Sequence, residues 1–105
     1  MSNYIVNWTD GNSQMENYLV VATSFASSAD IVWSKKSNQG YITAIYSTTL
    51  SIDKVMGPNV YYIIMNDGSK FFITSSTWTD AKDWVYQALG TDVNTIMYLG
   101  MVYLF

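Results

Sequence analysis

The sequence predicts an α+β fold, in which two tandem ββαβ units form a mostly antiparallel sheet with two helices packed on it. Three observations lead to this prediction. Short segments that alternate apolar and polar residues, as half-buried strands do, recur along the chain. Residues 79–89 carry apolar residues at helical spacing instead. The order of these segments is the same in both halves of the chain, which indicates an internal repeat.

The length of 105 residues fits a single domain, residues 1–105. Half of the residues are hydrophobic and 16% are aromatic, which is enough to build a core. The turn at residues 56–59 carries the only proline and separates repeat one (1–55) from repeat two (56–105). Because this connection is so short, we expect the two repeats to form one body.

Four blocks carry the repeat, and they occur in the same order in both halves. In the first pair, an aromatic residue lies at each end of both segments, with β-forming residues between. Each copy is therefore expected to form a hairpin, a helix and a third strand. The aligned blocks are 18–25 with 71–78, 30–33 with 83–86, 4–6 with 62–64, and 42–50 with 96–104.

Alternation predicts the strands of both copies. Asp67 and Gly68 form the expected tight turn of the second hairpin. The expected hairpin strands are 4–9 with 18–23, and 60–66 with 71–76. The third strand of copy one is expected over 41–52, where one face carries Ile42, Ala44, Tyr46, Leu50 and Ile52.

The second helix has the clearest local pattern. Thr77 and Asp80 have the spacing of a capping box, and Gly90 suits the position just after the helix. A single apolar stripe is formed by Ala81, Trp84, Val85, Ala88 and Leu89. We expect Trp84 to fill the groove between this helix and the sheet. The first helix, near residues 27–36, is expected mainly by analogy, with Trp33 in the matching role.

The composition excludes many kinds of active site. The chain has no cysteine, no histidine and no arginine, so disulfides, thiolate or imidazole metal sites and Ser-His or Cys-His mechanisms are excluded. The six glycines are isolated, so no phosphate-binding loop is present. Asp80 and Asp83 share a helix face, but acids in a first turn usually stabilise the helix dipole. We expect no enzyme activity, no cofactor and no metal.

The last strand has apolar residues on both faces, whereas a one-sided sheet needs only one apolar face. Its second face aligns with a polar row in copy one that includes Thr43 and Ser47. Such a surface is unusual for a monomer, so we expect a homo-oligomer that uses it as a subunit interface. The predicted interface residues are Met97, Leu99, Met101, Tyr103 and Phe105.

A family resemblance agrees with this pattern. The segment from Tyr4 to Trp8 followed by Asp10 and Gly11, and residues 22–24 leading into a helix, resemble small ββαβ proteins of marine phage (cyanophage) and ocean-metagenome sequences. The resemblance implies a viral or environmental origin and brings no catalytic motif.

A rival resemblance is to Sm-like barrels. A helix near 27–36 followed by a meander at 41–52, 59–66 and 70–76 is similar to the start of that fold. It implies ring assembly and binding of single-stranded nucleic acid, for which aromatics such as Tyr62 and Phe72 would provide stacking surfaces. The sequence departs from this pattern, because strands precede the first helix and a helix stands at 79–89.

The sequence as a whole therefore predicts a non-enzymatic structural or protein-interaction protein that associates with itself. Nucleic-acid binding is disfavoured by a net charge of −3 and by the scattered lysines. No apolar run has the length of a membrane span, and the N-terminal residues lack the pattern of a signal peptide. We expect a cytoplasmic protein, located in the host cytoplasm or the virion if it is viral.

Overall fold

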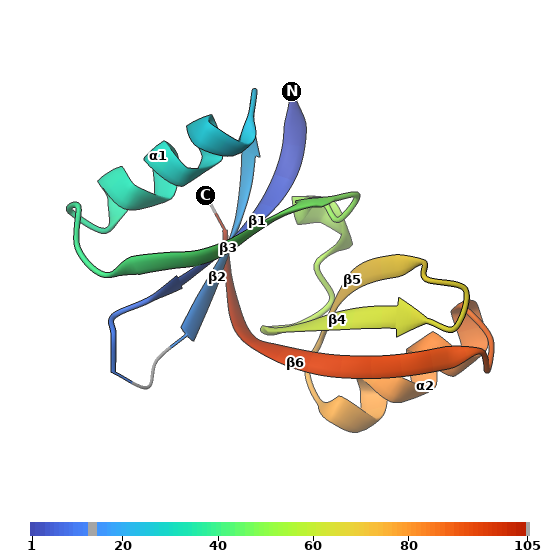
Figure 1. Ribbon diagram of the computed structural model, residues 1–105. Coiled ribbons are helices and arrows are strands. Elements are labelled where there is room, and N and C mark those ends of the chain that lie inside the picture. Colours follow the sequence, from blue (N-terminus) through green and yellow to red (C-terminus); the bar gives the residue numbers. More distant parts are fainter. Residues whose placement is uncertain (13–14, 105) are drawn as a thin grey trace.

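The computed structural model describes residues 1–12 and 15–104 (Figure 1). Within these residues the chain forms six strands, two α-helices and one short 3₁₀ turn. In chain order they are β1 (Ser2–Thr9), β2 (Met15–Ala22), α1 (Phe25–Lys35), β3 (Tyr41–Thr48), η1 (Ile52–Lys54), β4 (Asn59–Met65), β5 (Lys70–Ser75), α2 (Trp78–Ala88) and β6 (Val93–Leu104).

The strands form one sheet in the order β3-β1-β2-β6-β4-β5. The pairings are antiparallel except where β2 and β6 run parallel, with residues 16–19 opposite 101–104. The predicted α+β class is confirmed, and the sheet is mixed but mostly antiparallel. In each half the first strand lies between the other two. The long β6 crosses from one half to the other, as Figure 1 shows.

Most of the buried apolar side chains of the described residues gather in three clusters. One lies under α1 and is centred on Val6 and Val32, and a second lies under α2 and is centred on Ile63 and Val85. The third joins the two halves through the strand faces that carry no helix. Its buried members are Ile5, Leu19, Leu50 and Val60. The helices therefore cover the outside of a curled sheet, on opposite sides of the molecule (Figure 1).

Both helices begin at a capping side chain. The Ser24 hydroxyl accepts a hydrogen bond from the Ser27 amide, and the Thr77 hydroxyl accepts one from the Asp80 amide, both at 3.1 Å. The predicted cap of the second helix is confirmed, and Gly90 follows that helix with a φ of +96°.

The prediction that Trp84 fills the groove between helix and sheet is wrong. Ala81 and Val85 are buried there, whereas the Trp84 side chain is 44% exposed. Trp33 is only partly buried. The apolar stripe on α2 is wider than the contact with the sheet, so the large residue at its margin stays in solvent.

The expected alternation of the third strand in the first half is also wrong. β3 ends at Thr48, and a bulge at Thr43 changes its register opposite Asn7 and Trp8. Ile42 and Ile45 consequently both pack on the α1 side, although one was expected on each face. A one-residue insertion moves every later side chain to the other face, and alternation in the sequence does not reveal it.

A similar bulge divides β6. Val60 pairs with Gly100 and Tyr61 pairs with Tyr98, so Leu99 is the extra residue. Gly100 has a φ of +125°, and a Cβ there would lie 3.1 Å from Asn17 Nδ2.

Buried amide groups hold this bulge in place. The Asn17 side chain is fully buried and donates to the Leu99 carbonyl at 3.1 Å. It also accepts a hydrogen bond from Asn7 Nδ2 at 2.8 Å. The point at which β6 changes partner from β4 to β2 is thus fixed by a polar contact inside the molecule.

Candidate protein-interaction groove

The five predicted interface residues do not share one face. Met97 and Met101 are each 45% exposed, but they lie on either side of the bulge. Leu99 packs against the central cluster, and Tyr103 stacks on Tyr18 with ring centroids 5.2 Å apart. Phe105 lies outside the described residues. The bulge at Leu99 is the reason, because it exchanges the two faces of the strand.

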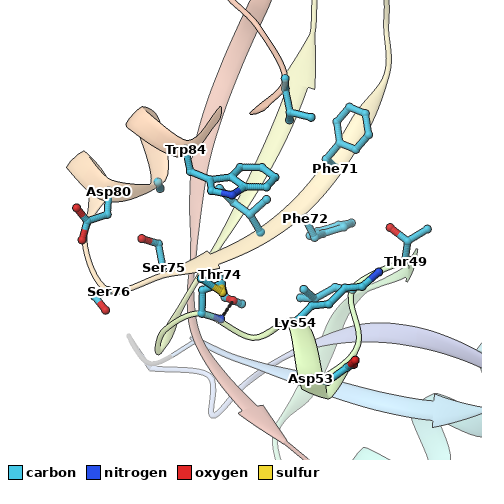
Figure 2. A pocket seen from close by; sticks show the side chains of 15 residues that line it. Thr49, Asp53, Lys54, Phe71, Phe72, Thr74, Ser75, Ser76, Asp80 and Trp84 are labelled. Carbon is cyan, nitrogen blue, oxygen red and sulfur yellow. Dashed lines mark hydrogen bonds between the residues drawn. The ribbon is translucent and has the colours of Figure 1, made fainter. Parts of the chain in front are cut away.

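A different apolar feature lies along β5. A cavity of about 670 Å³ opens between β5, α2 and the segment that follows β3 (Figure 2). We call it the β5 groove. Figure 2 shows Trp84 from α2 and Phe72 from β5 reaching into the same space. Its apolar lining includes Leu50, Met56, Phe71, Phe72, Ile73, Ala81, Trp84 and Leu89.

The groove exists because β5 has an open edge. β5 is the last strand of the sheet and pairs with β4; on its other side none of the described strands pairs with it. β3 is the other edge strand, and the ring centroids of its Tyr46 and of Phe72 are 5.1 Å apart. The chain then leaves the sheet, since the Lys54 amide bonds to the Ser51 carbonyl at 2.9 Å in a 3₁₀ turn.

One end of this edge is covered by the turn between the two halves. The Met56 amide donates to Thr74 Oγ1 at 2.7 Å, and Asn59 Nδ2 donates to the Ser76 carbonyl at 3.0 Å. A Cβ on Gly57 would lie 2.4 Å from the Ser75 carbonyl carbon, so only glycine allows this approach. The open part of the edge is therefore residues 70–73.

One of the aromatic residues that line the groove, Phe72, is packed against the core of the protein. Phe72 stacks on Tyr62 with ring centroids 4.6 Å apart and belongs to the central cluster. Trp84 and Phe71 are 44% and 37% exposed, so apolar surface is presented to solvent beside an unpaired strand edge. This combination favours binding of another chain.

The charged groups of the groove lie at its rim. Asp53, Lys54 and Asp80 border the cavity. A hydrogen bond from the Ser51 hydroxyl holds the pKa of the Asp53 carboxyl below its usual range. The rim therefore carries both signs of charge around an apolar centre, an arrangement that suits a polypeptide segment better than a polyanion.

The sequence contained only partial signals of this site. The sequence offers Phe72 only as a stacking surface for single-stranded nucleic acid, and it predicts Trp84 as a core residue. The structure adds that β3 ends at Thr48 and that none of the described strands pairs with the outer edge of β5. No local pattern in the sequence records which strand becomes an edge.

Comparison of the chain with protein-family models, with curated proteins and with solved structures finds no match. Among the described residues, no helix has the length and apolar character needed to cross a membrane.

Proposed function

We propose that this chain is a non-enzymatic protein-interaction module that binds an extended segment of another polypeptide in the β5 groove. The single observation that carries the proposal is an open strand edge beside an apolar cavity of about 670 Å³. Strand addition supplies affinity through main-chain hydrogen bonds and specificity through pockets for alternate side chains. The cavity volume falls within the range of roughly 300–1,000 Å³ that is common for ligand sites.

We also propose that the two halves are copies of one ββαβ unit. β6 has a second register shift at Asn94, between Ile64 and Met65 of β4, and it corresponds to the shift at Thr43, between Asn7 and Trp8 of β1. This matches Trp8 with Met65. The helices agree as well, because Val32 and Val85 are buried at the same distance from their caps.

This correspondence changes two blocks of the alignment made from the sequence. It matches Ile5 with Tyr62 rather than with Ile63, and Ile42 with Val93 rather than with Ile96. It leaves the blocks 18–25 with 71–78 unchanged.

Self-association remains part of the proposal. Tyr98 and Met101 are exposed on β6 and lie opposite Tyr61 and Asn59 of β4, on the same face of the sheet, and the ring centroids of Tyr98 and Tyr61 are 5.5 Å apart. We expect light scattering to give more than one subunit at micromolar concentration. The double variant Tyr98→Ser with Met101→Lys should be monomeric and folded. A monomeric wild type would contradict an oligomer, and an assembled variant would exclude this surface as its contact.

Binding of single-stranded nucleic acid has less support. Lys36 Nζ forms an ion pair with Glu16 at 3.1 Å and lies 4.0 Å from the Trp8 ring centroid. Its positive charge is therefore engaged in contacts within the chain rather than presented to a phosphate. Lys54 borders the groove beside Asp53. The phage-like origin and the cytoplasmic location remain predictions from the sequence alone.

The proposal is tested by titrating the ¹⁵N-labelled protein with a panel of short capped peptides that differ in apolar content, and with oligo-dT. We expect apolar peptides to shift the amide signals of residues 70–73 and the Trp84 indole signal, and oligo-dT to leave them unchanged. Trp84→Ala should weaken peptide binding about tenfold. Tyr86→Ala is the matched control, since Tyr86 is 40% exposed on the same helix but does not line the groove. If no peptide shifts these signals, the proposed function is wrong.

A further inference from the structure

We infer that the segment bound in the β5 groove runs parallel to β5 and presents one aromatic side chain between two aliphatic ones, as residues 102–104 of this chain do. This inference rests on the proposed function and adds the direction and the sequence class of the partner. The observation behind it is that β6 covers the edge of β2 in the first half of the molecule, which corresponds to the open edge of β5.

The edges of β2 and β5 are equivalent in the two halves. Leu19 of β2 faces Ile5, and Phe72 of β5 faces Tyr62. Leu19 also lies as many residues before the helix cap Ser24 as Phe72 lies before Thr77. Two independent counts, one across the hairpin and one along the chain, thus match Leu19 with Phe72.

The β2 edge is covered and the β5 edge is open. Residues 101–104 pair in parallel with residues 16–19 of β2. By the correspondence of Leu19 with Phe72, residues 16–19 match residues 69–72, which largely coincide with the open part of the β5 edge. A strand of about four residues on that edge would therefore complete the second half as β6 completes the first.

The contacts made by residues 101–104 show which side chains fit such an edge. Tyr103 stacks on Tyr18 on the side of α1, and Val102 packs into the central cluster. The residue that corresponds to Tyr18 is Phe71, which is 37% exposed, whereas Tyr18 is 5% exposed. An aromatic residue of the partner would cover Phe71 as Tyr103 covers Tyr18.

The remaining walls fit the same pattern. Trp84 lines the groove on the α2 side and would adjoin the aromatic residue of the segment. The aliphatic neighbours of that residue would point to the opposite face, toward Phe72 and Leu50. The turn at 56–58 covers the Ser75 end of β5, so a parallel segment enters beside Lys70 and ends or turns beside Thr74.

The test uses a capped peptide with the sequence Gly-Met-Val-Tyr-Leu, carrying lysines for solubility and a nitroxide label at either end. With the ¹⁵N-labelled protein, the label at the N-terminal end should broaden amide signals near Lys70. The label at the C-terminal end should broaden signals near Ser75. Replacing the peptide tyrosine with serine should weaken binding about tenfold, because the aromatic contact is lost. Phe71→Ser in the protein should have a similar effect, and Tyr86→Ala less than about twofold.

The outcomes separate this inference from the proposed function. Reversed broadening, or equal binding of the tyrosine and serine peptides, overturns the inference and leaves peptide binding in the groove intact. If the protein alone shifts the same signals with rising concentration, the occupant is a second copy and the inference is wrong. Broadening at β2 shows exchange with β6 and also overturns it. If this peptide and the whole panel leave residues 70–73 unchanged, both proposals fail.

Discussion

β2 and β5 are each the second strand of a hairpin that leads into a helix, and the proposed repeat makes their outer edges equivalent, yet β6 pairs with β2 and no described strand pairs with the outer edge of β5. The difference arises in the third strands. β6 continues past the bulge at Leu99 to Leu104 and pairs with β2, whereas β3 stops at Thr48 and the chain turns into η1. The length of the third strand thus decides whether the neighbouring edge is buried or exposed. The open edge is the one with a cavity beside it, which is why we place the interaction site there.

The largest effect that separates the two edges should come from the matched pair Tyr18 and Phe71. Tyr18 is buried beneath Tyr103, and Tyr18→Ala should lower the free energy of unfolding by about 3–5 kcal/mol. Phe71→Ala should cost about 1 kcal/mol or less, because its ring is partly in solvent. Urea unfolding of both variants measures the difference. Equal losses would mean that the β5 edge is covered as well.

The bulge in β6 gives the next effect. Gly100→Ala should destabilise the fold by about 1–3 kcal/mol, since it combines a positive φ with close contacts to Asn17 and to the Met15 carbonyl. Gly90→Ala is the control, because Gly90 has a positive φ of +96° but no atom within 4 Å of the added Cβ. Thermal or urea unfolding should show a smaller loss for the control. A harmless Gly100→Ala would contradict the described bulge.

An alkaline transition should report on Tyr18 in the first half and on Tyr61 in the second, where burial also raises the pKa of the hydroxyl. Burial raises the pKa of the Tyr18 hydroxyl, and its hydrogen bond to the Glu16 carboxylate raises it further. Burial lowers the pKa of the Lys36 ammonium, but hydrogen bonds to Tyr18 and Glu16 outweigh burial and raise it overall.

Both groups hold their protons more tightly in the folded state than in the unfolded state. Their contribution is therefore complete below about pH 10 and is lost as the pH rises through the folded-state pKa values. Urea unfolding measured from pH 8 to 11 should show this decline, and Tyr18→Phe should make it shallower. A Tyr18→Phe variant with an unchanged slope would show that other tyrosines cause it.

The smallest expected effect concerns the two exposed aromatics of α2. Trp84→Ala should lower the free energy of unfolding by about 1 kcal/mol or less, and Tyr86→Ala should lower it by a similar amount. If urea unfolding gives similar losses of unfolding free energy for the two variants, Trp84 is a surface residue and not a core residue. A loss of about 3 kcal/mol or more at Trp84 alone would restore its assignment to the core.

The helices and hairpins were predictable because their signals are local. Thr77 caps α2 as its spacing with Asp80 predicts, and Asp67 with Gly68 makes the expected turn of the second hairpin, where the Gly68 amide bonds to the Met65 carbonyl at 3.0 Å. The faces of the third strands were not predictable. Their bulges depend on the partner strand, and for β6 on the buried Asn17 side chain. The candidate site was not predictable for the same reason. The position of Trp84 in the apolar stripe of the helix is the same whether its side chain packs in the core or lines a groove.

The sequence by itself determined the α+β class, the number and order of the strands and α-helices, and the absence of thiol and imidazole chemistry, because these depend on composition and on contacts between near neighbours. Only the tertiary structure decided the parallel pairing of β2 with β6, the exchange of faces at Leu99, and the open edge of β5. Each of these depends on which distant strand supplies the hydrogen-bond partners. A strand that receives no such partner has the same local sequence signals as one that does, and it differs only in what its edge is free to bind.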